Sequence, residues 1–302
     1  MTKLIIAGGS GFLGNAIAEY FKPKFDEIII LTRDASATKN GISFVTWDGK
    51  TAGAWQKELE NCTVLINMAG KSVDCRYTEK NKKAILSSRI ESTRVLGDVI
   101  STLKNPPKVW LNSSTATIYR HSEDKQMDEF SGELGTGFSV SVGKAWEAEF
   151  FKNPLPKTRR VALRTAIVLA KNDGAFVPIK MLAKFGLGGK QGNGNQQFSW
   201  IHIHDFLKSI DFCLENDSLE GPINISAPNP ITNSYLMQGV RKAVKIPFGL
   251  PLSKSMLEIG ARIIKTEPEL VLKSRNVIPK KLTDTGFEFK YSTIESALED
   301  LV

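Results

Sequence analysis

The fold is decided by the stretch Lys3-Leu4-Ile5-Ile6-Ala7-Gly8-Gly9-Ser10-Gly11-Phe12-Leu13-Gly14, which lies at the start of this 302-residue chain. Residues 4–7 form a short apolar run, which is typical of a strand buried on both faces of a sheet. A glycine-rich turn follows, and apolar residues then recur at the spacing of a helix, at Phe12, Leu13, Ile17 and Phe21. Strand, glycine turn and helix in this order are the context in which dinucleotide-binding turns occur.

Each glycine of this turn has its own physical task. We expect Gly8 to let the chain turn tightly out of the strand and Gly14 to let the helix pack closely on it. At Gly11 the lack of a side chain lets the backbone approach a pyrophosphate, and the helix N-terminus adds free N–H groups and a positive dipole end. A glycine turn without a ligand is the alternative. The predicted cofactor contacts in this stretch are Gly8, Ser10, Gly11, Phe12 and Leu13.

Composition narrows the class of protein. No apolar run approaches the length of a membrane span, and the first strand begins too early to leave room for a signal peptide, so we expect no membrane partner. Cys62, Cys75 and Cys213 show no metal-ligand spacing, so we expect no metal site and a reduced, cytoplasmic protein. The formal charge of +8 lies in short clusters rather than in one basic arm. We therefore expect an anionic cofactor or substrate to be attracted, but no nucleic-acid partner.

Strand and helix patterns alternate through the first half of the chain, which predicts an α/β fold with a Rossmann-type doubly wound parallel sheet. After Leu169 the character changes, because glycines and prolines punctuate the sequence. We predict an NADP-binding Rossmann domain over 1–169, with its sheet completed by about 201–227. A smaller, mainly helical C-terminal substrate domain would comprise 170–200 and 228–302. Strands are expected at 27–31, 43–47, 63–67, 108–112, 160–164 and 222–225, with an alternating stretch over 198–205.

Two strand ends point to the cofactor. The second strand ends at Thr32-Arg33-Asp34. An acidic residue there would hold the ribose hydroxyls of NAD, whereas an arginine would pair with the 2′-phosphate of NADP. Because Arg33 comes first, we favour NADP(H) over NAD(H); an exposed loop charge is the alternative. The fourth strand ends in Met68-Ala69-Gly70, whose small residues leave room for a ligand at the sheet edge.

Taken together, these motifs resemble the extended short-chain dehydrogenases/reductases, also called NAD-dependent epimerases/dehydratases. The glycine turn, Asn67-Met68-Ala69-Gly70 and Ser113-Ser114-Thr115-Ala116-Thr117-Ile118-Tyr119 carry this resemblance. Further stretches resemble a narrower subfamily labelled nucleoside-diphosphate-sugar epimerases, or SulA-like proteins, which has a small extra C-terminal domain. These stretches are Trp47-Asp48-Gly49, Arg76-Tyr77-Thr78, Ser88-Arg89-Ile90-Glu91-Ser92-Thr93, Lys144-Ala145-Trp146-Glu147, Phe198-Ser199-Trp200-Ile201-His202 and Ile278-Pro279-Lys280-Lys281-Leu282.

The resemblance implies a mechanism. In the superfamily a tyrosine exchanges the proton of a substrate hydroxyl, and a lysine one helical turn later lowers the pKa of that tyrosine and binds the nicotinamide ribose. A serine or threonine at the end of the fifth strand holds the reacting oxygen. Thr115 and Lys144 suit the last two roles. By the same resemblance, Ser113, Arg89, Lys144 and the backbone at Ile167 would contact the cofactor.

The sequence departs from this pattern at one key position. Val140 stands four residues before Lys144, where the tyrosine is expected, and valine has no proton to give. Three accounts remain open. Another side chain supplies the proton, with Tyr119 the nearest phenol in sequence and His202 and His204 as other groups. Alternatively the reaction needs no tyrosine, or the protein binds NADP(H) without turnover.

The sequence thus predicts an NADP(H)-dependent oxidoreductase of the epimerase/dehydratase type. It would act on a small polar substrate, of which a nucleotide sugar is one candidate, with Thr115, Lys144 and Tyr119 as catalytic residues. The alternative is a catalytically silent NADP(H)-binding regulatory or sensor protein. We expect a small-molecule substrate as partner, which the positive charge allows to be anionic, and a monomer or homodimer.

Overall fold

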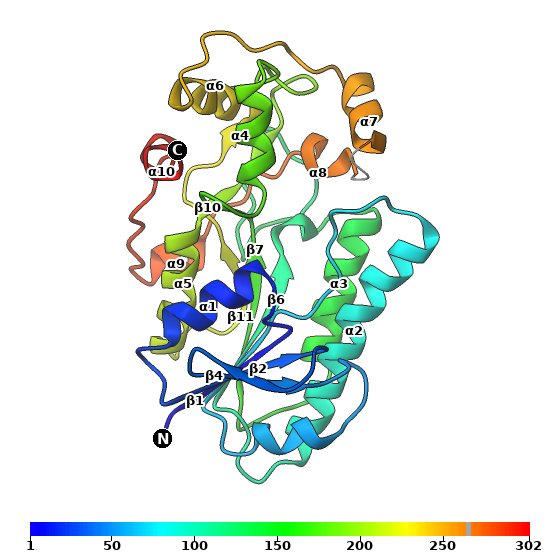
Figure 1. The fold of residues 1–302 in the computed structure, drawn as a ribbon, viewed down its shortest axis with the longest axis vertical. Helices are drawn as coiled ribbons and strands as arrows, with labels where there is room; N and C mark the ends of the chain where they lie inside the picture. The colour runs from blue at the N-terminus through cyan, green and yellow to red at the C-terminus, as the bar shows by residue number, and fades with distance from the viewer. Residues whose placement is uncertain (264–266) are drawn as a thin grey trace.

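The computed structural model describes residues 1–263 and 267–302 and is built around one large sheet (Figure 1). The strand order of this sheet is β11-β7-β6-β5-β1-β2-β4-β3, and neighbouring strands are parallel except for β3 and β4. The predicted doubly wound parallel fold is therefore confirmed. The strands are β1 (Lys3–Ala7), β2 (Glu27–Thr32), β3 (Ala37–Lys39), β4 (Ile42–Thr46), β5 (Val64–Asn67), β6 (Val109–Thr115), β7 (Arg159–Thr165) and β11 (Gly221–Ile225).

Helices cover both faces of this sheet, as the continuous apolar strands require. Along β2, Ile28 and Ile30 pack into one layer, while Ile29 and Leu31 pack into the other. The first layer is formed with α1 (Phe12–Phe21) and α5 (Ile203–Glu215), and the second with α2 (Glu79–Thr102) and α3 (Phe138–Phe151). The two pairs lie on opposite sides of the sheet in Figure 1. The core of the larger part is thus a three-layer sandwich.

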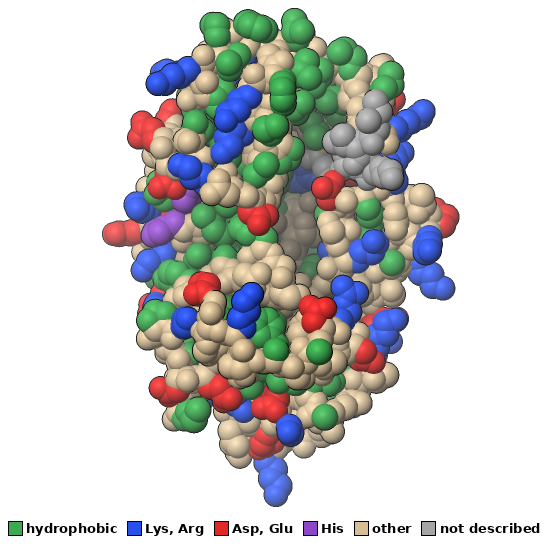
Figure 2. All heavy atoms as spheres, in the orientation of Figure 1, with side chains coloured by type: hydrophobic (Ala, Val, Ile, Leu, Met, Phe, Trp, Pro, Cys, Tyr) green, Lys and Arg blue, Asp and Glu red, His purple; other side chains and the backbone are tan. Residues whose placement is uncertain are grey.

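A second hydrophobic cluster lies beyond the carboxyl ends of the strands, around Phe176 and Trp200. It is formed by α4 (Phe176–Lys184), α6 (Asn233–Ala243) and α10 (Ile294–Leu301), next to the short pairs β8 (Ile167–Leu169) with β10 (Trp200–His202) and β9 (Gln197–Phe198) with β12 (Ile231–Thr232). The C-terminal segment adds α7 (Lys254–Ile263), α8 (Glu269–Leu272) and α9 (Lys280–Asp284). Figure 2 shows a hollow in the surface between the large sheet with its helices and the part formed around Phe176 and Trp200, with basic side chains inside the hollow.

The stretch 198–205 differs from its expected pattern. Its alternation ends early, because α5 begins at Ile203. The cause is local: the imidazole of His202 accepts a hydrogen bond from the N–H of His204 and so caps the helix. Several short elements also lie outside the predicted strands and helices. They include β8 and β12, β3, which forms a hairpin with β4, and the 3-10 turns η1 (Ala54–Leu59) and η2 (Ala116–Ile118).

Among the helices of residues 1–263 and 267–302, none combines the length and apolar character that crossing a bilayer would require.

Candidate cofactor-binding and active site

The glycine turn between β1 and α1 is shaped by close backbone contacts. Gly8 has a φ of 69°, and a Cβ placed on it would lie 2.6 Å from the Cα of Ala69. A Cβ on Gly14 would lie 2.4 Å from the backbone of Gly9. The prediction that Gly8 allows a tight turn is therefore confirmed, and Gly14 allows α1 to pack closely, against the turn at Gly9 rather than against the strand itself. Gly11 is different, because no atom lies within 4 Å of a Cβ built on it.

The first turn of α1 leaves its N–H groups available. Gly11 is the N-cap residue, and no side chain accepts from the first turn. Within residues 1–263 and 267–302, the one polar side-chain contact at this turn is the hydrogen bond from the Asn15 amide to the Ser10 carbonyl. Ser10 itself is exposed, whereas the side chains of Phe12 and Leu13 are partly buried. Uncapped N–H groups beside an open glycine are a suitable cradle for a pyrophosphate.

The end of β2 places one exposed cation at this edge of the sheet. The Thr32 hydroxyl donates to the Asp34 carboxylate at 3.2 Å, which turns that carboxylate toward the strand end. Arg33 between them is exposed, and within the described residues its guanidinium has no hydrogen-bond or ion-pair partner. An exposed guanidinium without a protein partner is available to pair with a phosphate.

The loop after β5 borders the glycine turn. Its conformation is fixed by the Met68 N–H, which donates to the Ala7 carbonyl at 2.8 Å, and by the Ala69 N–H, which donates to the Asn67 side chain at 3.0 Å. The Ser113 hydroxyl, from the end of β6, lies 3.0 Å from the sulfur of Met68. The predicted contacts from the ends of β5 and β6 therefore lie together.

Arg89 connects this loop to α2 and α3. Its guanidinium donates to the carbonyls of Lys71 and Ile85 at 3.0 and 2.9 Å and lies 4.9 Å from the ring of Trp146. A Cβ on Gly70 would lie 3.1 Å from the Arg89 Cζ. Burial lowers the pKa of Arg89 to about 10. Arg89 thus supports the loop through Gly70 and places a positive charge beside it.

Thr115, at the end of β6, faces α3. Its side-chain oxygen accepts from the Thr117 N–H at 3.1 Å, and a Cβ on Gly143 would lie 3.1 Å from its Cγ2. Lys144 follows on the helix and donates to the Gly135 carbonyl at 2.8 Å. Val140 is fully buried. The helix therefore approaches Thr115 as the family pattern implies, without a phenol at position 140.

Tyr119 is buried and does not face the candidate cofactor site. Only 2% of its surface is exposed; its hydroxyl donates to Asn224 at 2.9 Å and accepts from Arg164 at 2.8 Å. Arg164 is itself held by both carboxylate oxygens of Glu147, at 2.8 and 2.7 Å. Burial raises the pKa of Tyr119. This placement corrects our expectation of a catalytic role for Tyr119, because the phenol is a packed member of a buried network and lacks access to a substrate.

The two histidines considered from the sequence have structural roles. His202 is 2% exposed, stacks on Tyr291 with 3.9 Å between ring centroids, and has its Nε2 3.2 Å from Asp300. Burial lowers the pKa of His202. The Nδ1 of His204 lies 3.0 Å from the buried carboxylate of Asp205. The ring of His202 is therefore committed to capping α5 and to packing.

Ile167 opens β8. Its N–H donates to the Ser199 carbonyl at 3.2 Å, so the amide hydrogen already has a partner. Any contact that Ile167 makes with a carboxamide would have to use its carbonyl or its partly exposed side chain.

A polar cluster that sequence reasoning missed comes from the C-terminal segment. The Lys273 ammonium donates to the Thr117 carbonyl at 3.1 Å, and the Arg275 Nε donates to the Thr117 hydroxyl at 2.9 Å. The Glu269 carboxylate accepts from the Ser139 hydroxyl, in the first turn of α3, at 3.1 Å. Only the basic character of 273–281 signalled this cluster, because its members are 130 or more residues from their partners in the chain.

Tyr77 is a second missed residue. Its ring lies 5.0 Å from that of Phe138, and its N–H donates to Glu267 at 2.6 Å. Burial raises the pKa of the phenol, while Ser139 and Arg275 oppose that shift. Tyr77 therefore brings a phenol to the first turn of α3 from the loop before α2.

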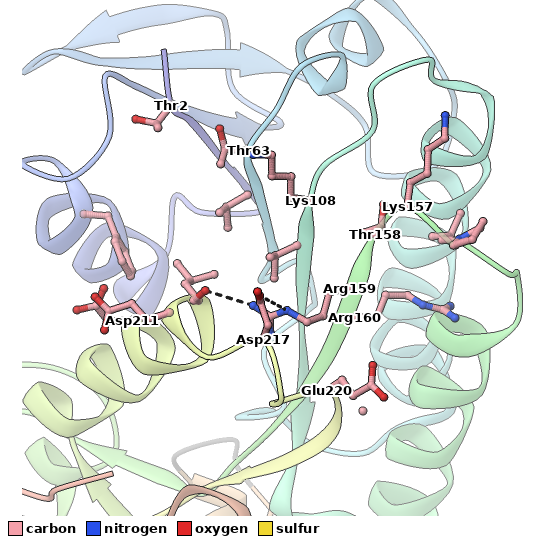
Figure 3. Close-up of a pocket in the computed structure, with 18 of the residues that line it drawn as sticks. Thr2, Thr63, Lys108, Lys157, Thr158, Arg159, Arg160, Asp211, Asp217 and Glu220 are labelled. Carbon is pink, nitrogen blue, oxygen red and sulfur yellow. Dashed lines mark hydrogen bonds and ion pairs between the residues drawn. The ribbon is translucent and has the colours of Figure 1, made fainter. Parts of the chain in front are cut away.

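A large cavity lies elsewhere, at the amino ends of the strands. It has a volume of about 1400 Å³ and is lined by residues such as Thr2, Thr63, Lys108 and Thr158. Figure 3 shows Arg159 reaching toward Asp217 there; the two ends are 3.4 Å apart, and the Arg159 guanidinium also donates to two backbone carbonyls. Ligands of parallel α/β sheets bind at the carboxyl ends. This cavity is therefore a structural feature rather than the cofactor site.

Comparison with known proteins agrees with the class that this geometry defines, an α/β protein with a dinucleotide site. Residues 4–145 match the family described as NAD dependent epimerase/dehydratase family, and residues 255–301 match a domain of unknown function, DUF1731. The chain is 33% identical over 301 residues to the epimerase family protein YfhF of Bacillus subtilis, covering 99% of this chain and 98% of the relative. The chain belongs to the NAD-dependent epimerase/dehydratase family.

Solved structures extend this comparison. Human epimerase family protein SDR39U1, solved with NADPH, is 27% identical and has a TM-score of 0.88, covering 99% of both chains. A nucleoside-diphosphate sugar epimerase from Corynebacterium glutamicum is 25% identical with a TM-score of 0.79, covering 99% of this chain and 58% of that one. The family binds NAD(P), and this chain shares its nucleotide-binding fold from end to end.

Proposed function

We propose that this protein is an NADP(H)-dependent oxidoreductase of the epimerase or reductase type that acts on a small polar substrate. The observation that carries the proposal is the glycine turn, where Gly8 and Gly14 are closed by backbone contacts while Gly11 opens onto the uncapped N-terminus of α1. The neighbouring Arg33 supports NADP(H) over NAD(H). The relative solved with NADPH, human SDR39U1, supports the same choice.

The residues present fit this cofactor. The first turn of α1 would hold the pyrophosphate, Arg33 the 2′-phosphate, and Ala69 with Gly70 would border the adenosine side. Lys144 would donate to a ribose hydroxyl in place of the Gly135 carbonyl. When bound, the nicotinamide exchanges a hydride with a substrate carbon. Thr115 would hold the substrate oxygen through its hydroxyl.

Calorimetric titration with NADPH and NADH tests the proposal. We expect tight binding of NADPH and much weaker binding of NADH. The Arg33→Ala variant should lose this preference. Lys39→Ala, which removes an exposed cation next to Ile42 at the amino end of β4, should keep it. Absence of binding by either nucleotide would refute the proposal. Oxidation of NADPH in the presence of a panel of small carbonyl compounds and nucleotide sugars then tests turnover.

A catalytically silent NADP(H)-binding sensor is the second candidate, favoured by Val140, which removes the phenol of the family mechanism. It predicts the same cofactor affinity without oxidation of NADPH by any member of the panel. For either function we expect a small-molecule partner and a monomer or homodimer. Sedimentation measures the oligomeric state directly.

A further inference from the structure

The cluster contributed by the C-terminal segment reaches the helical turn that lacks the tyrosine. Lys273 Nζ lies 3.1 Å from the Thr117 carbonyl and 3.9 Å from the Glu269 carboxylate, which in turn accepts from Ser139 at 3.1 Å. Ser139 directly precedes Val140. These polar contacts therefore link the Lys273 ammonium to Ser139, the neighbour of the position where the family carries its phenol.

The same face of α3 meets Thr115. Gly143 packs against Thr115, and residues three and four positions earlier on a helix lie on the same face. Those residues are Val140 and Ser139. Lys273 is held at the Thr117 carbonyl, two residues after Thr115, and its partner Glu269 contacts Ser139, so its ammonium lies close to the end of β6 and to the first turn of α3. It also lines a cavity of about 810 Å³ together with Gly135, the residue that holds Lys144.

The surroundings of Lys273 suit proton exchange at neutral pH. Its side chain is 10% exposed, and burial lowers its pKa to about 8; the nearby Arg275 lowers it further, whereas Glu269 opposes the shift. Glu269, on α8, and Arg275, two residues after Lys273, are the charged groups that shift its pKa. The other titratable side chains that line the same cavity are Arg120, His121, Lys254, Glu258 and Glu267, and the Ser274 N–H donates to His121. A lysine with an ordinary pKa would hold its proton too tightly to act as a base near neutrality.

We propose that Lys273 is the proton-exchanging residue that replaces the missing tyrosine in the oxidoreductase inferred above, on which this assignment rests. In the reductive direction the bound cofactor would supply a hydride for the new C–H bond, and the carbonyl π bond would break. The oxygen takes a proton from the Lys273 ammonium, and the neutral amine regains one from water in the cavity. In the oxidative direction the neutral amine accepts the hydroxyl proton.

Two experiments test this assignment, and the first needs no substrate. Lysines are acetylated competitively with acetic anhydride across the neutral to alkaline range, and each site is quantified by peptide mass spectrometry. We expect Lys273 to reach half of its maximal labelling near pH 8 and to be slowed by NADP⁺. Lys280 is the internal control, because its ion pair with Asp284 raises its pKa and it is exposed. Labelling of Lys273 only at the alkaline end, or labelling unchanged by NADP⁺, would overturn the assignment.

The second experiment separates proton exchange from a structural role. Lys273→Arg keeps a cation that can donate to the Thr117 carbonyl but does not release a proton near neutrality. For any carbonyl that the wild type reduces, we expect at least about a hundredfold loss of kcat with unchanged NADPH affinity. Wild-type reduction should also fall above pH 8, roughly tenfold per pH unit, since the ammonium is then lost. The control Lys280→Met should keep both rate and profile.

The outcomes separate this assignment from the proposed function. Failure to bind NADPH ends both. Normal binding and reduction in Lys273→Arg would overturn the role of Lys273 alone. Tyr77 is the alternative proton-exchanging residue, so the Tyr77→Phe variant is measured in parallel with Lys273→Arg. Loss of the rate and of its pH dependence in Tyr77→Phe, with Lys273→Arg unaffected, would assign the proton to the phenol instead.

Discussion

The two walls of the cleft are built in different ways. The cofactor wall is built around the backbone of one continuous stretch, in which Gly8, Gly11 and Gly14 lie within seven residues, and the end of β2 adds the side chain of Arg33. The opposite wall is made of side chains from the loop before α2, the first turn of α3 and the segment 269–275. Backbone geometry leaves a strong local signature in a sequence, whereas a site assembled from distant side chains leaves almost none. The contrast explains why the sequence predicts the class of cofactor but does not predict the proposed proton donor.

The largest effect should follow substitution of a glycine that closes the turn. Gly8→Val places a β-branched side chain at positive φ and drives it into the backbone of Ala69. These two penalties together cost about 3 kcal/mol or more of folding free energy. We expect poor yield or a strongly lowered Tm, measured by thermal unfolding. A stable, fully folded Gly8→Val protein would mean that the turn does not have this geometry.

Gly11→Val sharpens the comparison, because it is the same substitution three residues away. Gly11 has φ −85° and ψ 179°, an extended conformation that valine readily adopts, and no atom lies near its Cβ direction. The protein should therefore fold with an unchanged Tm. The side chain would occupy the space of the pyrophosphate, and we expect NADPH affinity to fall at least about a hundredfold, or about 2.7 kcal/mol. Unchanged affinity in calorimetry would move the cofactor site elsewhere.

Arg33→Ala tests a smaller effect on the same wall. Charge-assisted hydrogen bonds to a phosphate contribute about 1.5–3 kcal/mol, so NADPH affinity should fall roughly tenfold to a hundredfold. NADH lacks the 2′-phosphate and should bind as before. Titration of both nucleotides against wild type and variant is the measurement. Equal losses for the two would show that Arg33 does not read the 2′-phosphate.

What the sequence could and could not predict follows from the same contrast between local backbone and distant side chains. Apolar runs such as residues 4–7 predicted the strands because burial on both faces demands them. The glycine spacing predicted the turn, and the resemblance carried over to Thr115 and Lys144. The sequence could not predict the hydrogen-bond partners of Tyr119, because Asn224 and Arg164 come from other strands of the sheet. Lys273 and Glu269 were missed for the same reason: only folding brings them to Ser139 and Thr117.

The smallest effect should come from Tyr119→Phe, which separates the buried network from the cleft. The substitution removes one donor to Asn224 and one acceptor for Arg164, while Glu147 still holds the guanidinium with two hydrogen bonds. Leaving such buried groups short of a partner costs about 1–3 kcal/mol of folding free energy. Denaturant unfolding should therefore show a modest loss, with NADPH affinity and any turnover unchanged. Tyr20→Phe, which removes a hydroxyl bonded to Asp211 on the far side of the sheet, is the matched control. Loss of turnover in Tyr119→Phe at unchanged stability would instead place the proton donor behind β6, and the wall built from the C-terminal segment would then have only a binding role.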